Sequence, residues 1–205
     1  MSVHPVATVA GLPVSADEVD AAEARLRNAP GASVLPARDT SEGRQLRRWL
    51  TQLIVTERVV AAEAAARGLT GLGAPTQAEL LPDVTARLEI GSVAAATLAD
   101  PCARALFADV TAAVRVTDDD VADYHARNPL RFVQACPDRH GWRTQPTEGP
   151  SLAEVRSEIA EHLRGAARRR AFRVWLDARR AELVQLAAGY EHPGDPRQPD
   201  NTHQH

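Results

Sequence analysis

Lysine is absent from this chain of 205 residues, so all 24 basic residues are arginine, and aromatic residues make up only 4%. The missing lysine is what the codon usage of a GC-rich genome produces, and we attach no functional meaning to it. Because rings are few and 44% of the residues are apolar, Ala, Leu and Val have to fill the core. Strong β-formers are also sparse. The composition therefore favours an aliphatic and helical interior.

Other absences indicate where in the cell the protein works and argue against binding to nucleic acids or membranes. Two cysteines, Cys102 and Cys136, are too few for a disulfide framework. No apolar run approaches the roughly 18 residues of a membrane span. The first residues, MSVHPVATVAGLPVS, lack the basic start and the long apolar segment of a signal peptide. A net charge of −3 argues against a general nucleic-acid or anionic-membrane binder. We expect a cytoplasmic protein with reduced thiols that binds neither nucleic acid nor membrane.

Motifs that mark common enzyme classes are missing too. The sequence contains no G-x-S-x-G, no G-x-x-x-x-G-K, no G-x-G-x-x-G and no H-E-x-x-H. These absences argue against a serine-elbow acyltransferase, a P-loop or dinucleotide-binding protein and a zinc metalloprotease. We therefore favour a protein without catalytic activity.

Helix signals dominate what is present. A short strand and a tight turn at Gly11 to Pro13 precede a helix that Ser15 and Glu18 open as a capping box. The strongest signal follows, a long spine helix that ends before Gly68. Its apolar stripe consists of Leu46, Leu50, Leu53, Ile54, Val60, Ala61 and Ala64.

Further helices are expected along the rest of the chain. Two stretches, 75–91 and 92–114, are predicted to be helical, and in the second Asp100 and Pro101 restart the helix. Thr117 caps a short helix that Asn128 and Pro129 stop. Residues 131–150 read as an irregular connection. The last helix begins at the box of Ser151 and Glu154 and is predicted to run to about Ala187.

Three stretches in this order carry a family resemblance. They are G-x-P-V-S-x-x-E-V (Gly11 to Val19), L-x-x-L-I-V-x-E-x-x-V-x-x-E-A-x-x-R-G-L (Leu50 to Leu69) and V-T-D-D-D-V-x-x-Y-x-x-x-N-P-x-R-F (Val116 to Phe132). The order resembles the SurA/PrsA type of chaperone, the helical foldase class that carries parvulin prolyl isomerase domains. The segment SLAEVRSEIAEHLR looks like the helix that returns from the parvulin domain to complete the chaperone lobe.

The resemblance implies a fold and a division of the chain. The fold is all-α: a SurA/PrsA-like helical chaperone lobe with a long spine helix, a long C-terminal helix, a short N-terminal strand and a flexible His/Pro-rich tail. Residues 1–132 form the first part of the lobe and 151–188 complete it, while 189–205 form the tail. The connection 133–150 is too short for a parvulin domain, although His140 to Gln145 resembles its last strand. No catalytic residue of the family is carried over.

The tail, GYEHPGDPRQPDNTHQH, offers a candidate metal site. Imidazole and carboxylate groups are ligands that zinc or iron accepts. The prolines would stiffen such a site, but a solvated, disordered end is the alternative interpretation. The candidate ligands are His192, Asp195, Asp200, His203 and His205.

Other candidate ligands lie on helices and in the connection. Glu158 and His162 share a helix face at i, i+4, and Glu57 falls within the apolar stripe of the spine helix. The alternative is a solvated pair and a core glutamate paired with arginine. Cys136 and His140 could be a nucleophile with its base or half a metal site, but neither an orienting acid nor a second Cys/His pair is recognisable.

Arginines crowd the last helix and suggest a partner. Docking of an acidic carrier protein or of a phosphate is one interpretation, and an ordinary solvated face with helix ion pairs is the other. The arginines concerned are Arg164, Arg168, Arg169 and Arg173.

Two functions from different classes follow. The first is a non-catalytic accessory protein that binds a polypeptide client or a partner enzyme in an apolar groove between helices. The second is a small metal-dependent enzyme or metal-binding accessory protein that uses the tail. A protein related to peptidyl-prolyl isomerases and a purely structural role are weaker alternatives.

Overall fold

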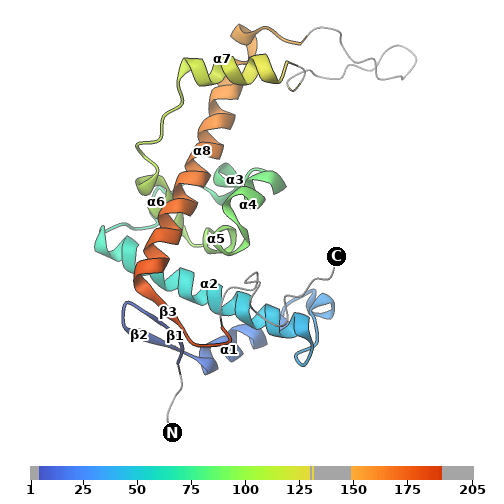
Figure 1. The fold of residues 1–205 in the computed structure, drawn as a ribbon, viewed down its shortest axis with the longest axis vertical. Helices are drawn as coiled ribbons and strands as arrows, with labels where there is room; N and C mark the ends of the chain where they lie inside the picture. The colour runs from blue at the N-terminus through green and yellow to red at the C-terminus, as the bar shows by residue number, and fades with distance from the viewer. Residues whose placement is uncertain (1–4, 130, 132–148, 191–205) are drawn as a thin grey trace, which may run out of the picture.

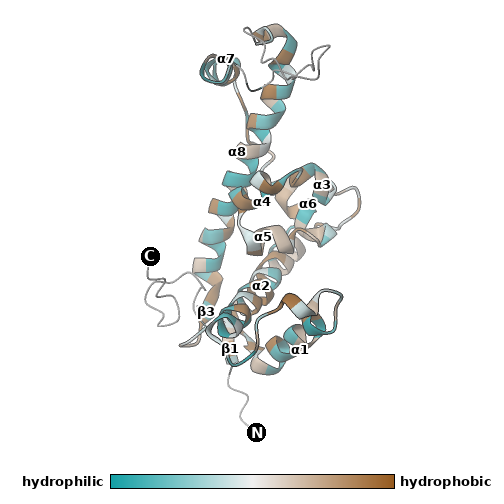
Figure 2. Ribbon diagram, turned by 90° about the vertical axis from the view of Figure 1, so that its right-hand side faces the viewer, coloured by the Kyte–Doolittle hydropathy of each residue, from teal (hydrophilic) through white to brown (hydrophobic). Residues whose placement is uncertain are grey.

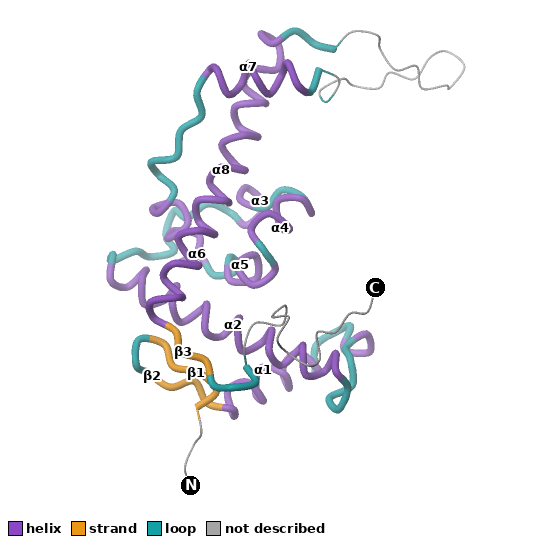
Figure 3. The backbone as a smooth tube through the Cα atoms, in the orientation of Figure 1, coloured by secondary structure: helices purple, strands orange, loops and turns teal. Residues whose placement is uncertain are grey.

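The computed structural model describes residues 5–129, 131 and 149–190. Over these residues the chain forms eight α-helices, one 3₁₀ turn and three short strands, which Figures 1 and 3 show. The elements are β1 (Pro5–Val9), β2 (Leu12–Ser15), α1 (Ala16–Arg27), η1 (Ala32–Val34), α2 (Ser41–Ala66), α3 (Gln77–Leu80), α4 (Val84–Ile90), α5 (Ser92–Thr97), α6 (Pro101–Val110), α7 (Asp118–Arg127), α8 (Leu152–Leu183) and β3 (Val184–Leu186).

A small antiparallel sheet with strand order β2-β1-β3 joins the two ends of the described chain. The turn between β1 and β2 places Ala10 (φ 49°) and Gly11 (φ 79°) in the left-handed region, as a tight hairpin requires. β3 pairs with the other edge of β1, with Val184 opposite Val9.

The prediction of an all-α fold was therefore wrong, and so was the prediction that the last helix continues to about Ala187. Helix α8 ends at Leu183, and the backbone N–H of Ala10 donates to the Leu183 carbonyl at 2.8 Å. Hydrogen bonds to β1 satisfy the backbone of Val184 to Leu186 in place of helical ones, so tertiary pairing overrides local helix propensity. The structure is mainly helical with a sheet at one end.

Helix α2 confirms the predicted spine helix. Thr40 caps it by accepting from the Gly43 backbone N–H at 3.0 Å. Gly43 has to lack a side chain, because a Cβ there would lie 2.0 Å from the Ala37 carbonyl oxygen. At the other end Gly68 takes φ 63°, and the Leu69 N–H bonds to the Ala64 carbonyl at 2.9 Å, as in a Schellman-type ending.

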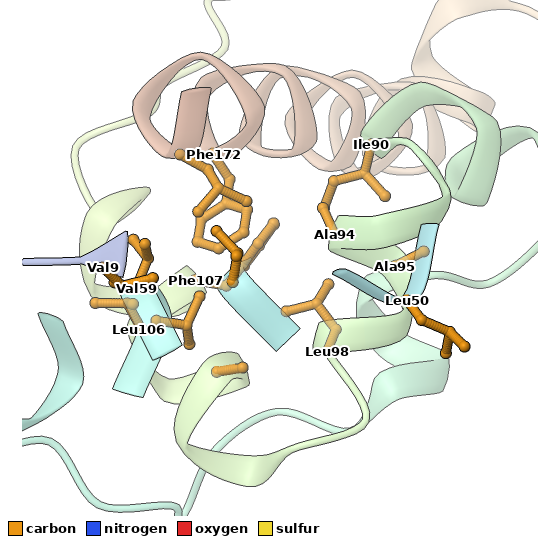
Figure 4. Close-up of a cluster of buried hydrophobic side chains, with 14 of the residues drawn as sticks. Val9, Leu50, Val59, Ile90, Ala94, Ala95, Leu98, Leu106, Phe107 and Phe172 are labelled. Atoms are coloured by element: carbon orange, nitrogen blue, oxygen red, sulfur yellow. The ribbon is translucent and has the colours of Figure 1, made fainter. Parts of the chain in front are cut away.

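The main core lies where α2, α5, α6 and α8 meet the sheet. Phe107 of α6 and Phe172 of α8 are both about 1% exposed, and their ring centroids lie 5.0 Å apart. Figure 4 shows Phe172 reaching down from α8 beside Phe107, with Leu98 and Val59 close by. Aliphatic side chains fill the remaining space, as the composition predicted.

Helix α7 is held separately, at the far end of α8 from the sheet (Figure 1). It packs on the N-terminal part of α8 through a small cluster of buried residues, Val121, Val155 and Ile159. We call α7 and residues 152–163 of α8 the arm, and the remaining described elements the body. Figure 2 shows hydrophilic residues along much of α8. No helix in the described residues is both long and apolar enough to cross a membrane.

Candidate functional site

Most of the predicted metal ligands cannot be placed. His192, Asp195, Asp200, His203 and His205 lie outside the described residues, as do Cys136 and His140. Within the described ranges, no group of three or more His, Cys, Asp or Glu side chains lies close enough together to hold a metal ion.

The three helical candidates do not come together. His162 belongs to the arm, where its ring centroid lies 5.5 Å from that of Tyr124. Burial lowers the pKa of His162, and the positive charge of Arg131 acts in the same direction. Glu158 is exposed on the same helix. Glu57 lies in the body, at a groove beside α2, so the described residues provide no common site for these side chains.

A groove beside α2 is a feature of the body that could hold a ligand. It consists of a cavity of about 700 Å³ and an adjoining one of about 240 Å³, and both are lined by Glu57, Ala61, Thr97 and Asp100. The larger cavity is completed by Glu18, Ala21, Arg25, Ile54, Arg58, Ala96 and Ala99. The smaller one is completed by Val60, Ala64, Ala65, Leu69, Cys102 and Ala103. We refer to these two adjoining cavities as the groove.

Small side chains leave the groove open. Helices α1, α2 and α6 and the end of α5 form its walls, and alanines occupy many of the lining positions. Ala61 had been predicted to belong to the buried stripe of α2, but it is exposed to the groove. The buried face of α2 is centred instead on Val55 and Val59, which are completely buried.

One wall of the larger cavity is fixed by an ion pair that joins three elements. Glu18 opens α1 in a capping box with Ser15 and also accepts a hydrogen bond from Arg58 of α2. Arg58 donates a second bond to the Pro13 carbonyl of β2 at 2.6 Å. The pair therefore holds α1, α2 and the hairpin in one arrangement, and its two charges offset each other.

Two further carboxylates stand where the cavities join. Burial against the groove raises the pKa of Glu57, and the negative charge of Asp100 adds to this, although Arg25 acts in the opposite direction. Asp100 caps α6 by accepting from the Cys102 backbone N–H at 2.6 Å. The groove thus combines an apolar end with acceptors at its middle.

This lining is suited to binding. Among the described residues no histidine lines the groove, and the side-chain hydroxyl and thiol there come from Thr97 and Cys102. The Thr97 hydroxyl donates to the Val93 carbonyl at 3.0 Å. The residues offer apolar surface and carboxylate acceptors, without a nucleophile held by a base.

Of the four arginines of α8 that suggested a partner, some bond to other elements of the body and some are exposed. Arg169 is buried, and its ion pair with Glu89 measures 2.7 Å. Arg168 donates to the Thr111 hydroxyl at 2.8 Å, and Arg173 donates to the Glu89 carbonyl at 3.0 Å. Arg164 is exposed. The expectation that all four lie on an outer docking face was therefore wrong for Arg169, because it fastens α4 to α8.

Sequence reasoning named Glu57 and missed its neighbours in the groove. Asp100 was interpreted only as a helix cap, and Arg25 was not singled out. Asp100 does cap α6, but a capping motif does not indicate which helix packs beside it. Only the packing of α1 and α6 beside α2 brings these side chains to Glu57.

One segment of the chain resembles a known protein family. A family model described as a family of unknown function (DUF7158) matches residues 5–42. This segment spans β1, β2, α1 and η1 and ends just inside α2, so it includes Glu18 and Arg25 of the groove. No curated protein matches the chain. No solved structure matches it either.

Proposed function

We propose that this protein is a non-catalytic binding protein that holds a segment of a polypeptide client or partner enzyme in the groove. The observation that carries the proposal is the groove itself, two adjoining cavities of about 700 and 240 Å³. The smaller is lined mainly by apolar side chains, and the larger combines small apolar side chains with the charged groups of Glu18, Arg25, Glu57, Arg58 and Asp100. Concave, mainly apolar surfaces with a small number of polar groups are typical of binding sites. The resemblance to SurA/PrsA-type chaperones supports the same class of function.

The groove is built on fixed elements, as a binding site requires. The Glu18–Arg58 pair links α1 to α2, and Asp100 fixes the start of α6. On the opposite side of α2, the completely buried Val55 and Val59 anchor the helix in the main core. The walls therefore do not have to form when a ligand arrives, which reduces the entropy lost on binding.

A bulky residue in the groove tests the proposal. Ala61 is exposed and lines both cavities, whereas the neighbouring Ala62 is exposed and lines neither. Ala61→Trp should therefore obstruct the junction of the two cavities, and Ala62→Trp is the matched control. We expect wild type and Ala62→Trp to suppress aggregation of a chemically unfolded model client measured by light scattering, and Ala61→Trp to lose most of this activity.

Two results would contradict the proposal. One is equal activity of Ala61→Trp and Ala62→Trp, which would place any client elsewhere. The other is a dimer in analytical ultracentrifugation that only Ala61→Trp dissociates, because a second copy of this chain would then occupy the groove.

Metal binding by the tail is a second candidate, favoured by the H-x-H of His203 and His205 with nearby carboxylates. Elemental analysis of the untagged protein beside a version that ends at Tyr190 tests it. The truncation keeps Tyr190, because its carbonyl accepts from the Gln52 amide at 3.1 Å and the Gly189 carbonyl accepts from Arg48 at 3.2 Å. Equal metal content in the two proteins would exclude the tail as the ligand set.

A further inference from the structure

We infer that the polypeptide segment held in the groove carries a basic side chain next to a large apolar one. The basic group would meet Glu57 and Asp100, and the apolar side chain would enter the smaller cavity beside them. This inference rests on the proposed function and specifies the chemistry of the partner.

The charges that line the groove do not cancel. Arg58 neutralises Glu18 through their ion pair, which leaves Glu57 and Asp100 against the single exposed Arg25. The described residues provide no hydrogen-bond donor to the Glu57 carboxylate. Burial raises its pKa, and the opposing effect of Arg25 is larger than the further rise caused by Asp100. Glu57 and Asp100 are both exposed at the groove, so their carboxylates are accessible to a ligand, and a positively charged donor would bind them as a charge-assisted partner.

Asp100 supports the same conclusion. Its Oδ1 atom is engaged by the Cys102 N–H. Both carboxylates line both cavities, so they stand at the junction of the groove. A lysine or arginine at this junction could reach both groups, whereas an acidic side chain would face two like charges.

The apolar part of the occupant follows from the smaller cavity. Val60, Ala64, Leu69 and Ala103 line it, and it holds about 240 Å³. This is room for one large aliphatic or aromatic side chain. Because the cavity adjoins the carboxylates, the basic and apolar residues of the ligand have to be close in its sequence, within about one helical turn.

Peptides that differ in one charge test the inference. Three labelled peptides would carry Lys, Gln or Glu at one central position between the same leucines, and fluorescence anisotropy at low salt would measure their affinity. We expect the affinity to decrease in the order Lys, Gln, Glu, with the Lys peptide binding at least about fivefold more tightly than the Glu peptide. Added salt should reduce this ratio.

A double variant tests whether Glu57 and Asp100 are the groups that distinguish the Lys peptide from the Glu peptide. Glu57→Gln with Asp100→Asn removes both charges, and Asn keeps the helix cap of α6. We expect the Lys-to-Glu affinity ratio to fall close to one. Glu158→Gln, which removes an exposed carboxylate from the arm, should leave the ratio unchanged.

The outcomes separate this inference from the proposed function. Equal affinities for the three peptides, all lost in Ala61→Trp, would overturn the charge preference and leave the groove as the binding site. A ratio that survives in the double variant would also overturn it, because other residues would then select the charge. If no peptide showed binding sensitive to Ala61→Trp, both proposals would fail.

Discussion

The body and the arm share one helix, α8, but they are held together in different ways. In the body, α8 contributes Phe172 and Leu176 to a core that also draws on α2, α5, α6 and the sheet. In the arm, α8 contributes Val155 and Ile159, which meet Val121 of α7. The apolar surface buried in the arm is therefore far smaller. Because burial of apolar surface is the main favourable term in folding, we expect the arm to open at a lower free energy than the body.

The ion pairs of the body are also more buried than that of the arm. In the body, Glu23 is 1% exposed and accepts hydrogen bonds from Arg27, Arg38 and Arg47, which ties the segment after α1 to α1 and α2. In the arm, Arg156 pairs with Asp118, and both side chains are well exposed. Exposed pairs contribute little to stability, whereas breaking a buried one is costly. The groove belongs to the body, so we expect its walls to open less readily than the arm.

The largest loss of stability is expected from Phe172→Ala. The ring is 1% exposed and packs on Phe107 at 5.0 Å, so its loss should leave a cavity in the main core. We expect a loss of about 3 to 5 kcal/mol in the free energy of unfolding, measured by urea denaturation. Val174→Ala, at a position 61% exposed on the same helix, is the control and should change it by less than about 0.5 kcal/mol. A loss in Phe172→Ala as small as that expected for Val174→Ala would contradict the packing of Phe172 in the main core.

Glu23→Gln should be the next most destabilising change and should alter the pH dependence. Burial raises the pKa of Glu23, but hydrogen bonds from Arg27, Arg47 and Arg38 outweigh it and hold the pKa below the ordinary value of 4.5. Since the pKa is lowered in the folded state, its contribution is present above about pH 4.5 and is lost as the pH falls through the lowered value. We expect a loss of about 3 kcal/mol at pH 7.

The measurement is urea denaturation of wild type and Glu23→Gln between pH 7 and pH 3. The difference between the two proteins should shrink as the pH falls below 4.5. A difference that stays constant over this range would mean that the carboxylate charge of Glu23 does not stabilise the body.

Ile159→Ala should separate the arm from the body. Ile159 is completely buried between α7 and α8, and its truncation should weaken the arm by about 2 to 4 kcal/mol. We expect hydrogen exchange to speed up in residues 118–127 while α2 and α6 keep their protection. Ser157→Ala, at an exposed position of the same helix, should leave exchange unchanged. Equal acceleration in α2 would show that the arm and the body unfold as one unit.

Helix ends could be predicted from the sequence because their signals are local. The capping boxes of Ser15 with Glu18 and Ser151 with Glu154 are confirmed, as are the cap of Asp100 before Pro101 and the start of α7 at Thr117. In each case the cap side chain and its backbone partner lie two or three residues apart. Chemistry over so short a range is the same whatever the rest of the fold does.

Features that depend on distant partners could not be predicted. Val184 to Leu186 forms a strand only because β1 is available, and the periodicity of α8 gives no sign of it. The stripe of α2 was predicted only in part: Leu50, Val60 and Ala64 are buried, but Ala61 lies on the open side. The groove depends on the positions of three helices. Glu57 could therefore be singled out from the sequence, but its neighbours Asp100 and Arg25 could not.

The smallest effect is expected from Asp118→Asn in the arm. It removes the exposed pair with Arg156, and also one of three acidic residues in the first turn of α7. Exposed pairs and helix-dipole interactions each contribute less than about 1 kcal/mol, so exchange in α7 should rise less than in Ile159→Ala. High salt should remove most of the difference from wild type. An effect as large as that of Ile159→Ala would mean that charge, and not the small apolar cluster, holds α7 on α8.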